Sequence, residues 1–430
     1  MEGVTKARAM KAIILAAGFG TRMGKNIPKP LIRVAGREMI YRTMKILSDY
    51  VDEFIVVVGK NGEKIDSFLK DKGFNYKIIR NPTPERGNGY SFYLTKDVSG
   101  DKFILVMGDH VYEEEFIKRA VEGEGLIVDR EPAYVDLEES TKVRCRNDRV
   151  EDIGKKLEEF DCVDTGFFVL SKDIYKHAES LVREKEVVEL SEIVKKAKIP
   201  VTEVSGYFWM DVDTVEDLKK ARKFIVRNSI KGAGDGYVAK YLNRRISLRL
   251  SELLVDHFTP NQMTFVSFLS GILSSLILFF SVPLAGIVYQ ISSIIDGCDG
   301  EIARASLRKS RIGEYTDSML DRYVDFIFLV TLAYVSNLSI YFWIVLAFAI
   351  FGSVMISYST EKYKAAFFES AYSAIPSLKY LIGKRDERIF AMMIFCLAGL
   401  VKPLIILLAI WTNIRVVATL LIIYKHKLGS

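Results

Sequence analysis

Long apolar runs follow one another from about residue 262 to the end of the chain, and they restrict its possible folds more than any other feature. A run of about 20 apolar residues is long enough to cross the hydrocarbon core of a bilayer as a helix. Runs of this kind lie at about 262–280, 283–303, 316–336, 339–358, 387–402 and 404–424. The sequence therefore predicts an all-α domain with six membrane spans.

The connections between these runs differ in charge. SVP, SNLS and LVKP carry at most one cation, whereas RASLRKSR, the stretch from TEKYK to GKRDER, and YKHK are rich in Lys and Arg. Basic connections stay on the cytoplasmic side. The N-terminus lacks the apolar run and cleavage site of a signal peptide. We therefore expect a multi-pass protein of the cell membrane, with its N-terminal domain and C-terminus in the cytoplasm.

The first half of the chain has a different pattern. Short apolar runs such as KAIILAA (Lys11–Ala17), EFIVVVG and KFILVMGD alternate with helical stretches such as REMIYRTMKILSDYV. This alternation predicts a Rossmann-like α/β domain with a mostly parallel sheet. Arginines among helically spaced apolar residues then indicate an amphipathic helix on the membrane surface. The expected organisation is a cytoplasmic domain at 1–228, a linker and juxtamembrane helix at 229–260, and a membrane domain at 261–430.

Composition excludes several classes of protein. The net charge of +6 is modest, and no helix-turn-helix, zinc-finger or base-stacking signature accompanies it, so nucleic acid is not an expected partner. The four cysteines, Cys145, Cys162, Cys298 and Cys396, lack C-x-x-C spacing. That argues against a disulfide framework or a zinc site.

A Gly-rich turn after the first predicted strand can bind phosphate through its backbone amides. Its string LAAGFGTRMGKNIPKPLIRV resembles the signature of the sugar-nucleotide pyrophosphorylase family of nucleotidyltransferases, L-x-x-G-x-G-x-R followed by P-K-x-L. The resemblance implies that Arg22 and Lys29 are catalytic and neutralise charge while a phosphate monoester attacks the α-phosphorus and diphosphate leaves. The implied nucleotide-binding residues are Ala16, Ala17, Gly18, Gly20, Thr21, Arg22 and Lys29.

Two further pieces match the same family in order. VMGD puts Asp109 at the end of a strand, and YFWMDVDTVEDL supplies Asp211 and Asp213. By resemblance, Asp109 and Asp211 bind Mg²⁺, or Mn²⁺, that bridges the triphosphate, with Asp213 as a nearby alternate. Mg²⁺ typically takes one or two carboxylates together with phosphates and water. The alternative for Asp213 is a helix cap at Asp213–Thr214.

Weaker matches concern the two substrates. Asn81, Asn88 and Ser91 fall where the family contacts the base. The second substrate is expected at Asp164, Gly166, and Lys155 or Lys156. Ordinary loop polarity and a solvated lysine pair explain these residues equally well.

Four aspartates lie at the mouths of two predicted spans, where charge is costly. Asp296 and Asp299 are spaced i, i+3, and Asp317 and Asp321 are spaced i, i+4, so each pair shares a helix face. Four carboxylates so close together would repel unless divalent metal ions lay between them. Ionisable groups near a span indicate function by default.

The full spacing, D-x-x-D-G-x-x-A-R-x8-G-x3-D-x3-D, resembles the CDP-alcohol phosphotransferase signature. The resemblance implies two Mg²⁺ ions held by the four aspartates, with Asp321 as the base that takes the acceptor proton. Asp325 lies outside the signature. The residues implied in binding the nucleotide are Gly300, Ala303, Arg304 and Gly313.

Cations in the cytoplasmic connections have two interpretations. Lys309, Arg311, Lys384, Arg385 and Arg388 could bind a phosphate on the acceptor. They could equally anchor the protein to membrane lipid headgroups.

One domain would make a CDP-alcohol and the other would consume it. This fusion resembles the family of bifunctional CTP:inositol-1-phosphate cytidylyltransferases and di-myo-inositol-phosphate-phosphate synthases. The resemblance implies CTP, inositol 1-phosphate and CDP-inositol as substrates, membrane lipids as partners and a homodimer formed through the membrane domain. The alternatives are a phospholipid synthase with its own CDP-alcohol supply and a membrane transporter with a nucleotide-sensing domain.

Overall fold

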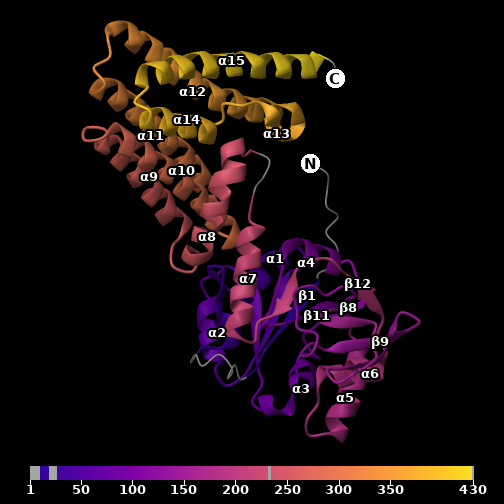
Figure 1. Cartoon of the computed structure of the whole chain (residues 1–430). Helices are drawn as coiled ribbons and strands as arrows, with labels where there is room; N and C mark the ends of the chain where they lie inside the picture. The colour runs from indigo at the N-terminus through magenta and orange to yellow at the C-terminus, as the bar shows by residue number, and fades with distance from the viewer. Residues whose placement is uncertain (1–9, 19–26, 231–233, 429–430) are drawn as a thin grey trace. The chain divides into compact units, whose positions relative to one another are not determined.

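The computed structural model describes residues 10–18, 27–230 and 234–428. It contains two compact units, Met1–Lys223 and Phe224–Ser430 (Figure 1). Each unit has its own core, so each is described by itself.

The centre of the N-terminal unit is a parallel sheet. Its strands lie in the order β6-β1-β4-β5. Their bounds are β1 Lys11–Ala16, β4 Glu53–Val58, β5 Tyr76–Arg80 and β6 Lys102–Met107. In β1, every residue from Ala12 to Ala16 is buried, as expected where helices cover both faces of a parallel sheet.

Antiparallel strands extend this sheet beyond β6. β11 (Cys162–Ser171) pairs with β6 and also with β8 (Gly125–Asp129) and β9 (Lys142–Arg146). β9 pairs with β10 (Arg149–Gly154), and β8 pairs in parallel with β12 (Val201–Glu203), so the described residues form a nine-stranded sheet. Two small ribbons complete the strands: β7 (His110–Tyr112) with β13 (Trp209–Asp211), and β2 (Arg33–Val34) with β3 (Arg37–Glu38).

Helices cover both faces of the sheet (Figure 1). Along β1, Ala12, Ile14 and Ala16 pack into one core, and Ile13 and Leu15 pack into the other. One face carries α1 (Met39–Leu47), α2 (Gly62–Leu69) and α4 (Glu114–Ala120), and the other carries α3 (Asn88–Tyr93), α5 (Ile174–Glu184) and α6 (Leu190–Ala197). The short helices are η2 (Lys29–Leu31) and η3 (Pro84–Arg86), and α7 (Val215–Arg227) follows β13. The predicted α/β fold is therefore confirmed.

The second unit is helical. Its bounds are η4 Ala239–Asn243, α8 Arg244–Leu254, α9 Pro260–Ile277, α10 Val282–Ala305, α11 Arg311–Val335, α12 Ile340–Phe367, α13 Ala371–Ala374, η5 Pro376–Tyr380, α14 Arg385–Leu397 and α15 Val401–Leu428. α9 starts where Thr259 and Gln262 exchange hydrogen bonds in a capping box, with Pro260 at the first helical position.

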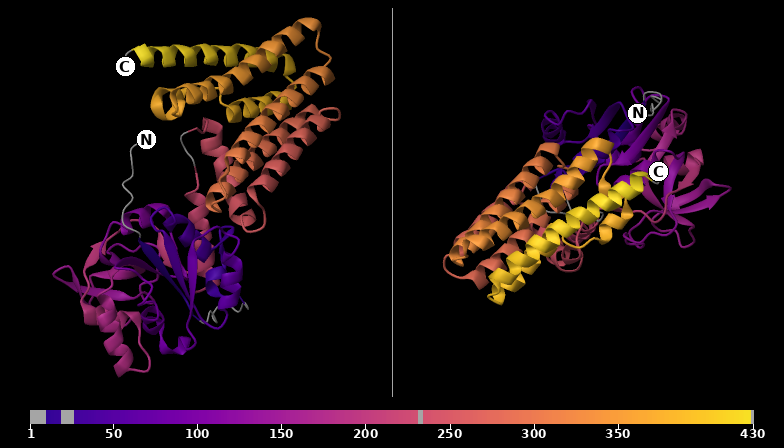
Figure 2. Two further views of the ribbon diagram at one scale, coloured as in Figure 1. Left: turned by 180° about the vertical axis from the view of Figure 1, so that it is seen from behind. Right: turned by 90° about the horizontal axis from the view of Figure 1, so that it is seen from above.

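Helix α10 lies at the centre of this unit. It packs against α8, α9 and α14, while α12 packs along α15, drawn in yellow in Figure 2. In the core the rings of Tyr289 and Phe328 stack with centroids 4.1 Å apart. Large apolar side chains remain exposed on the outside, including Phe280, Phe348 and Leu421. An outer surface of this kind is typical of a helix bundle surrounded by lipid.

Two helices in the described part of the chain, Ile340–Phe367 and Val401–Lys427, are long and apolar enough to cross a membrane. The run expected at 387–402 is different, because α14 ends at Leu397. Gly399 there takes a left-handed backbone conformation with φ of 69°, a common way to end a helix. The 13 residues of α14 span about 20 Å, which is less than the ~30 Å thickness of a hydrocarbon core.

Two candidate active sites

In the N-terminal unit, Lys29 lies between two of the predicted carboxylates. Its Nζ is 2.8 Å from Asp109 Oδ2 and also forms an ion pair with Asp213. Lys29 belongs to η2, Asp109 follows β6, and Asp213 follows β13. The carboxyl end of a parallel strand is where open α/β sheets bind their ligands. The structure therefore brings together one cation and two carboxylates from three separate parts of the chain.

The two aspartates of DVD have different surroundings. Asp211 lies in β13 opposite His110 of β7, whereas Asp213 reaches Lys29. The first turn of α7 is capped by Thr214, whose hydroxyl accepts from the Asp217 amide while the Asp217 carboxylate accepts from the Thr214 amide. The helix-cap role considered for Asp213 thus belongs to Thr214.

His110 is a further member of this site that the sequence analysis missed. Its Nδ1 lies 2.9 Å from Asp109 Oδ1, and its ring is nearly parallel to that of Trp209. Burial alone would lower the pKa of His110, but Asp109 outweighs it and the pKa is raised. Its place next to Asp109 in the sequence was the only signal that could have identified it.

The same contacts stabilise the charged forms of the other two groups. Burial would raise the pKa of Asp109, but His110 and Lys29 hold it well below its usual range. Burial would lower the pKa of Lys29, but Asp109 and Asp213 raise it. Asp109 is therefore an ionised carboxylate, the form that can hold a divalent cation.

Only part of the predicted phosphate loop is described. Ala16 ends β1, Ala17 is buried beside it, and Gly18 is exposed. Gly20, Thr21 and Arg22 lie outside the described residues.

The residues predicted to contact the base are hydrogen-bonded within the protein. Asn81 is buried, and its Nδ2 donates to Ser91 Oγ at 2.9 Å. Asn88 Oδ1 accepts from the Leu190 amide at 2.7 Å, at the start of α6. These polar side chains therefore form hydrogen bonds that hold the local structure in place. Their recognition of the base stays a prediction.

The residues predicted for the second substrate separate into two groups. Asp164 and Gly166 lie in β11, where the Gly166 amide donates to Asp164 Oδ1 at 2.7 Å and Gly166 lies against the His110 ring. Burial raises the pKa of Asp164 to about 6. Lys155 and Lys156 are exposed, and Lys155 faces Glu139 at 3.7 Å. The structure thus places Gly166, and Asp164 beside it, next to His110 of the Asp109 site.

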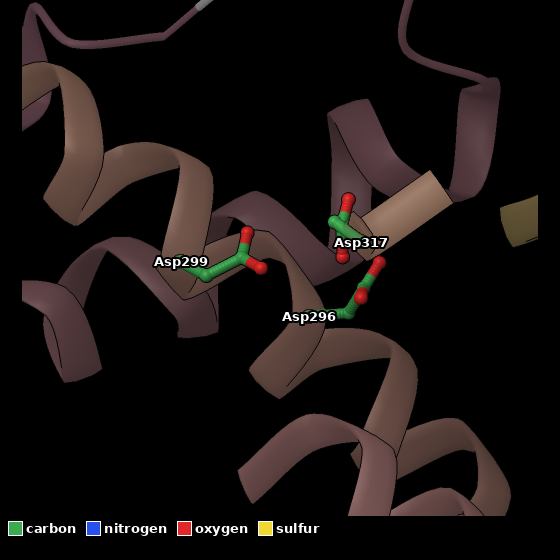
Figure 3. Close-up of side chains that lie close together, drawn as sticks. All are labelled: Asp296, Asp299 and Asp317. Carbon is green, nitrogen blue, oxygen red and sulfur yellow. The ribbon is translucent and has the colours of Figure 1, made fainter. Parts of the chain in front are cut away.

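In the helical unit, Asp296 and Asp299 of α10 face Asp317 of α11 (Figure 3). One oxygen from each carboxylate lies within 4.8 Å of the others. Hard cations such as Mg²⁺ prefer carboxylate oxygens as ligands. The three side chains are therefore close enough to share one divalent cation, and metal binding stays a prediction.

Hydroxyl groups on α9 orient two of these carboxylates. Thr264 Oγ1 donates to Asp299 Oδ2 at 2.6 Å, and Ser267 Oγ donates to Asp296 Oδ1 at 3.3 Å. Outer hydrogen bonds of this kind fix the orientation of metal ligands. Sequence reasoning missed both residues because Ser and Thr are common in apolar helices.

The fourth predicted ligand, Asp321, is oriented differently. Arg385 of α14 reaches Asp321 at 2.9 Å, Asp296 at 3.1 Å and Asp325 at 3.1 Å. Asp325 also accepts from Tyr289 at 2.5 Å and lies 3.9 Å from Arg388. Asp325, which lies outside the signature, is thus the carboxylate shared by Tyr289 and both arginines.

A cavity of about 260 Å³ opens beside these carboxylates. Its lining includes Asp296, Asp321, Lys384, Arg385 and Arg388. Lys309 and Arg311 are instead exposed near the start of α11. The cations predicted to meet an acceptor phosphate thus separate, and those of α14 and its N-cap line the cavity.

The glycines and cation of the signature lie on either side of the aspartates. Gly300, Ala303 and Arg304 continue α10 after Asp299, and Gly313 is in the first turn of α11. Arg304 Nε donates to the Ser229 carbonyl oxygen, and its guanidinium lies against Gly300.

Comparison with known proteins shows the class to which these two sites belong. Residues 12–126 match the family described as the MobA-like NTP transferase domain, and residues 257–424 match CDP-alcohol phosphatidyltransferase. The chain is therefore a transferase with one nucleotidyltransferase domain and one domain of the CDP-alcohol phosphatidyltransferase family.

Relatives match this chain over nearly its whole length, and so across both domains. The chain is 54% identical to the bifunctional IPC transferase and DIPP synthase of Archaeoglobus fulgidus, over 98% of this chain and 86% of that protein. It is 51% identical to the protein of that name from Aquifex aeolicus, over 97% and 98% of the two chains. It belongs to the family of bifunctional IPC transferases and DIPP synthases. A solved structure, the inositol-1-phosphate CTP transferase from T. maritima, is 28% identical with a TM-score of 0.46, covering 50% of this chain and 97% of that one.

Proposed function

We propose that this chain makes CDP-inositol in its N-terminal domain and consumes it in its membrane domain. The first reaction joins CTP and inositol 1-phosphate and releases diphosphate. The second transfers the inositol phosphate group of CDP-inositol to a hydroxyl of another inositol 1-phosphate and releases CMP. The observation that carries the proposal is the presence of two separate acidic sites, at Asp109 and at Asp296, in a chain of this family.

In the first reaction the phosphate of inositol 1-phosphate attacks the α-phosphorus of CTP. Lys29, already held between Asp109 and Asp213, would contact the triphosphate and oppose the charge that builds up during attack. Asp109, with Asp211 or Asp213, would hold Mg²⁺. Gly166 and Asp164, close to His110, would bound the space for inositol 1-phosphate.

In the second reaction an acceptor hydroxyl attacks the phosphorus that carries the inositol. A bond forms from that hydroxyl oxygen to phosphorus, the bond to CMP breaks, and the hydroxyl proton goes to Asp321. Asp296, Asp299, Asp317 and Asp321 would hold two Mg²⁺ ions, which neutralise charge on the diphosphate when bound. Thr264 and Ser267 would keep two of these carboxylates oriented.

We also propose which helices lie in the membrane and which parts of the chain face the cytoplasm. Helices α9 to α12, α14 and α15 would be embedded in the bilayer, with α14 crossing only part of it because of its length. The catalytic domain at 1–228 and the C-terminus would face the cytoplasm, joined to the membrane domain at 261–430 by the segment 229–260. A homodimer would form through the membrane domain, whose exposed apolar side chains support a lipid or protein neighbour.

The test uses the purified full chain in detergent with CTP, Mg²⁺ and inositol 1-phosphate. We expect diphosphate, CMP and a diester carrying two inositols and two phosphates, identified by mass. Asp321→Asn should stop at CDP-inositol, and Asp109→Asn should make the diester only when CDP-inositol is supplied. Loss of both activities from either variant would contradict the two-site proposal.

A further inference from the structure

Glu301 is a fully buried carboxylate that the second reaction does not use directly. It lies in α10, two residues after Asp299, with a relative exposure of 0%. Its Oε1 accepts from Arg244 Nη1 and from Ser247 Oγ, and its Oε2 accepts from Ser251 Oγ, each at 2.7 Å. A buried carboxylate needs this kind of compensation because leaving it unpaired is costly.

The three donors lie on one face of the juxtamembrane region. Arg244, Ser247 and Ser251 are spaced i, i+3 and i+7 in α8. Gly297 of α10 allows the close approach, since a Cβ at that position would lie 3.2 Å from Arg244 Nη1 and 3.4 Å from Ser247 Oγ. α8 is therefore fixed directly on the turn of α10 that carries Asp296 and Asp299.

Arg244 connects this turn to a second segment, residues 234–239, which we call the strap. The Nε and Nη2 atoms of Arg244 donate to the two Asp235 carboxylate oxygens at 2.9 and 3.0 Å. The Asp235 carbonyl oxygen accepts from Lys384 Nζ at 2.7 Å. A continuous chain of contacts thus runs from Glu301 through Arg244 and Asp235 to Lys384.

The far end of the strap is fixed to α14. The Ala239 amide donates to Asp386 Oδ2 at 2.7 Å, and the Tyr237 amide donates to Glu387 Oε1 at 3.0 Å. Asp235 and Arg244 line the same cavity as Asp296 and Lys384. The strap is therefore a wall of the cavity. Its Asp235 end is held by Lys384 and by Arg244, which Glu301 orients, and its other end is held by Asp386 and Glu387 of α14.

We infer that Glu301 is a positioning residue for the phosphotransfer reaction, which acts by fixing Arg244 and, through Asp235, the strap that holds Lys384 at the cavity. This inference depends on the function proposed for the membrane domain. Lysine could not replace Arg244, because only the planar guanidinium can contact Glu301 and both oxygens of Asp235 at once.

The test compares Glu301→Gln, Arg244→Lys and Ser251→Ala in the full chain. CDP-inositol and inositol 1-phosphate are supplied, and each variant's melting temperature is measured in the same detergent. We expect Glu301→Gln and Arg244→Lys to lower kcat/KM about ten- to a hundredfold. KM for inositol 1-phosphate should rise more than kcat falls, because Lys384 is at the end of the chain of contacts. Ser251→Ala removes one donor to Glu301 without touching Arg244, so it should lower the melting temperature and keep the parental kcat/KM.

A purely structural role predicts something different. In that case kcat/KM would fall in step with the melting temperature in all three variants, and this result would overturn the inference. Parental kcat/KM in Arg244→Lys would overturn it too. CDP-inositol formation from CTP serves as an internal control in every variant. If the parent protein itself makes no diester, the proposed function fails, and that outcome is distinct from either of the others.

Discussion

Replacing Asp325 tests whether this carboxylate holds the membrane-domain site together. Asp325→Ala removes the acceptor of the buried Tyr289 hydroxyl and the counterion of Arg388, whose side chain is 4% exposed. Breaking a buried pair by deleting one partner costs about 3–5 kcal/mol. For a unit of this size, each kcal/mol corresponds to about 2–4 °C. We therefore expect the melting temperature to fall by about 6–20 °C.

Two matched variants divide this effect into its parts. Asp325→Asn keeps an oxygen for the Tyr289 hydroxyl but loses the charge that faces Arg385 and Arg388, so it should cost about 1.5–3 kcal/mol. Tyr289→Phe removes only the hydroxyl and should cost about 1 kcal/mol. The assay is thermal unfolding of the full chain in detergent. Hydrogen exchange of α10 follows the unfolding of the helical unit, and hydrogen exchange of β1 follows that of the N-terminal unit.

We expect the melting temperature to fall most in Asp325→Ala, less in Asp325→Asn and least in Tyr289→Phe. If Asp325→Ala melts within 1–2 °C of the parent, roughly the range of a neutral surface substitution, the arginines do not depend on Asp325 and the reasoning is wrong. A shift of the β1 transition in place of the α10 transition would also refute it, because Asp325 belongs to the helical unit.

Three further outcomes follow from the N-terminal unit. Lys29→Met should lower CDP-inositol formation about a hundredfold or more, as loss of a charge-stabilising group does, while diester synthesis from supplied CDP-inositol continues; equal loss of both reactions would contradict this. The folded-state pKa of Asp164 is raised to about 6 from an ordinary 3.8, so the unfolded state releases its proton first and stability should fall as pH rises from 3.8 to about 6. Asp164→Asn should remove that part of the pH dependence of β11 hydrogen exchange, and an unchanged profile would count against a buried carboxyl. Cys145 and Cys162, with sulfurs 3.6 Å apart, should form a disulfide when the oxidant diamide accepts their two electrons and two protons; mass spectrometry should show this bond in the parent and not in Cys145→Ser.

The parts of the fold that sequence reasoning predicted well are those in which local pattern and burial agree. KAIILAA, EFIVVVG and KFILVMGD became β1, β4 and β6 because each is apolar on both faces and short enough for a strand. The apolar run at 387–402 misled the prediction, because hydrophobicity alone does not mark the left-handed residue Gly399 that ends α14. A stop of this kind depends on one backbone conformation and not on composition.

The sites show the same division. Helical spacing predicted that Asp296 and Asp299 share a face of α10. Asp317 belongs to α11 and joins them only through the placement of that helix. The contacts of Arg385 could not be predicted, since they depend on how α14 packs against α10 and α11. Glu301 occupies a variable position of the signature and could have been a solvated charge; only the packing of α8 shows that it is buried.

Arg385 lies far along the sequence from the aspartates that it contacts, and this has a consequence for biosynthesis. Arg385 lies 89 residues after Asp296 and 60 residues after Asp325. At ribosomal rates of about 5–20 residues per second, the first gap corresponds to about 5–20 s. During that interval the nascent aspartates have no arginine from α14, so these carboxylates must stay in water until Arg385 has been made. The last tenth of the chain, from Arg385 onward, thus completes a site whose carboxylates were made first. A chain truncated before Arg385 would lack the cation that pairs with Asp296 and Asp321.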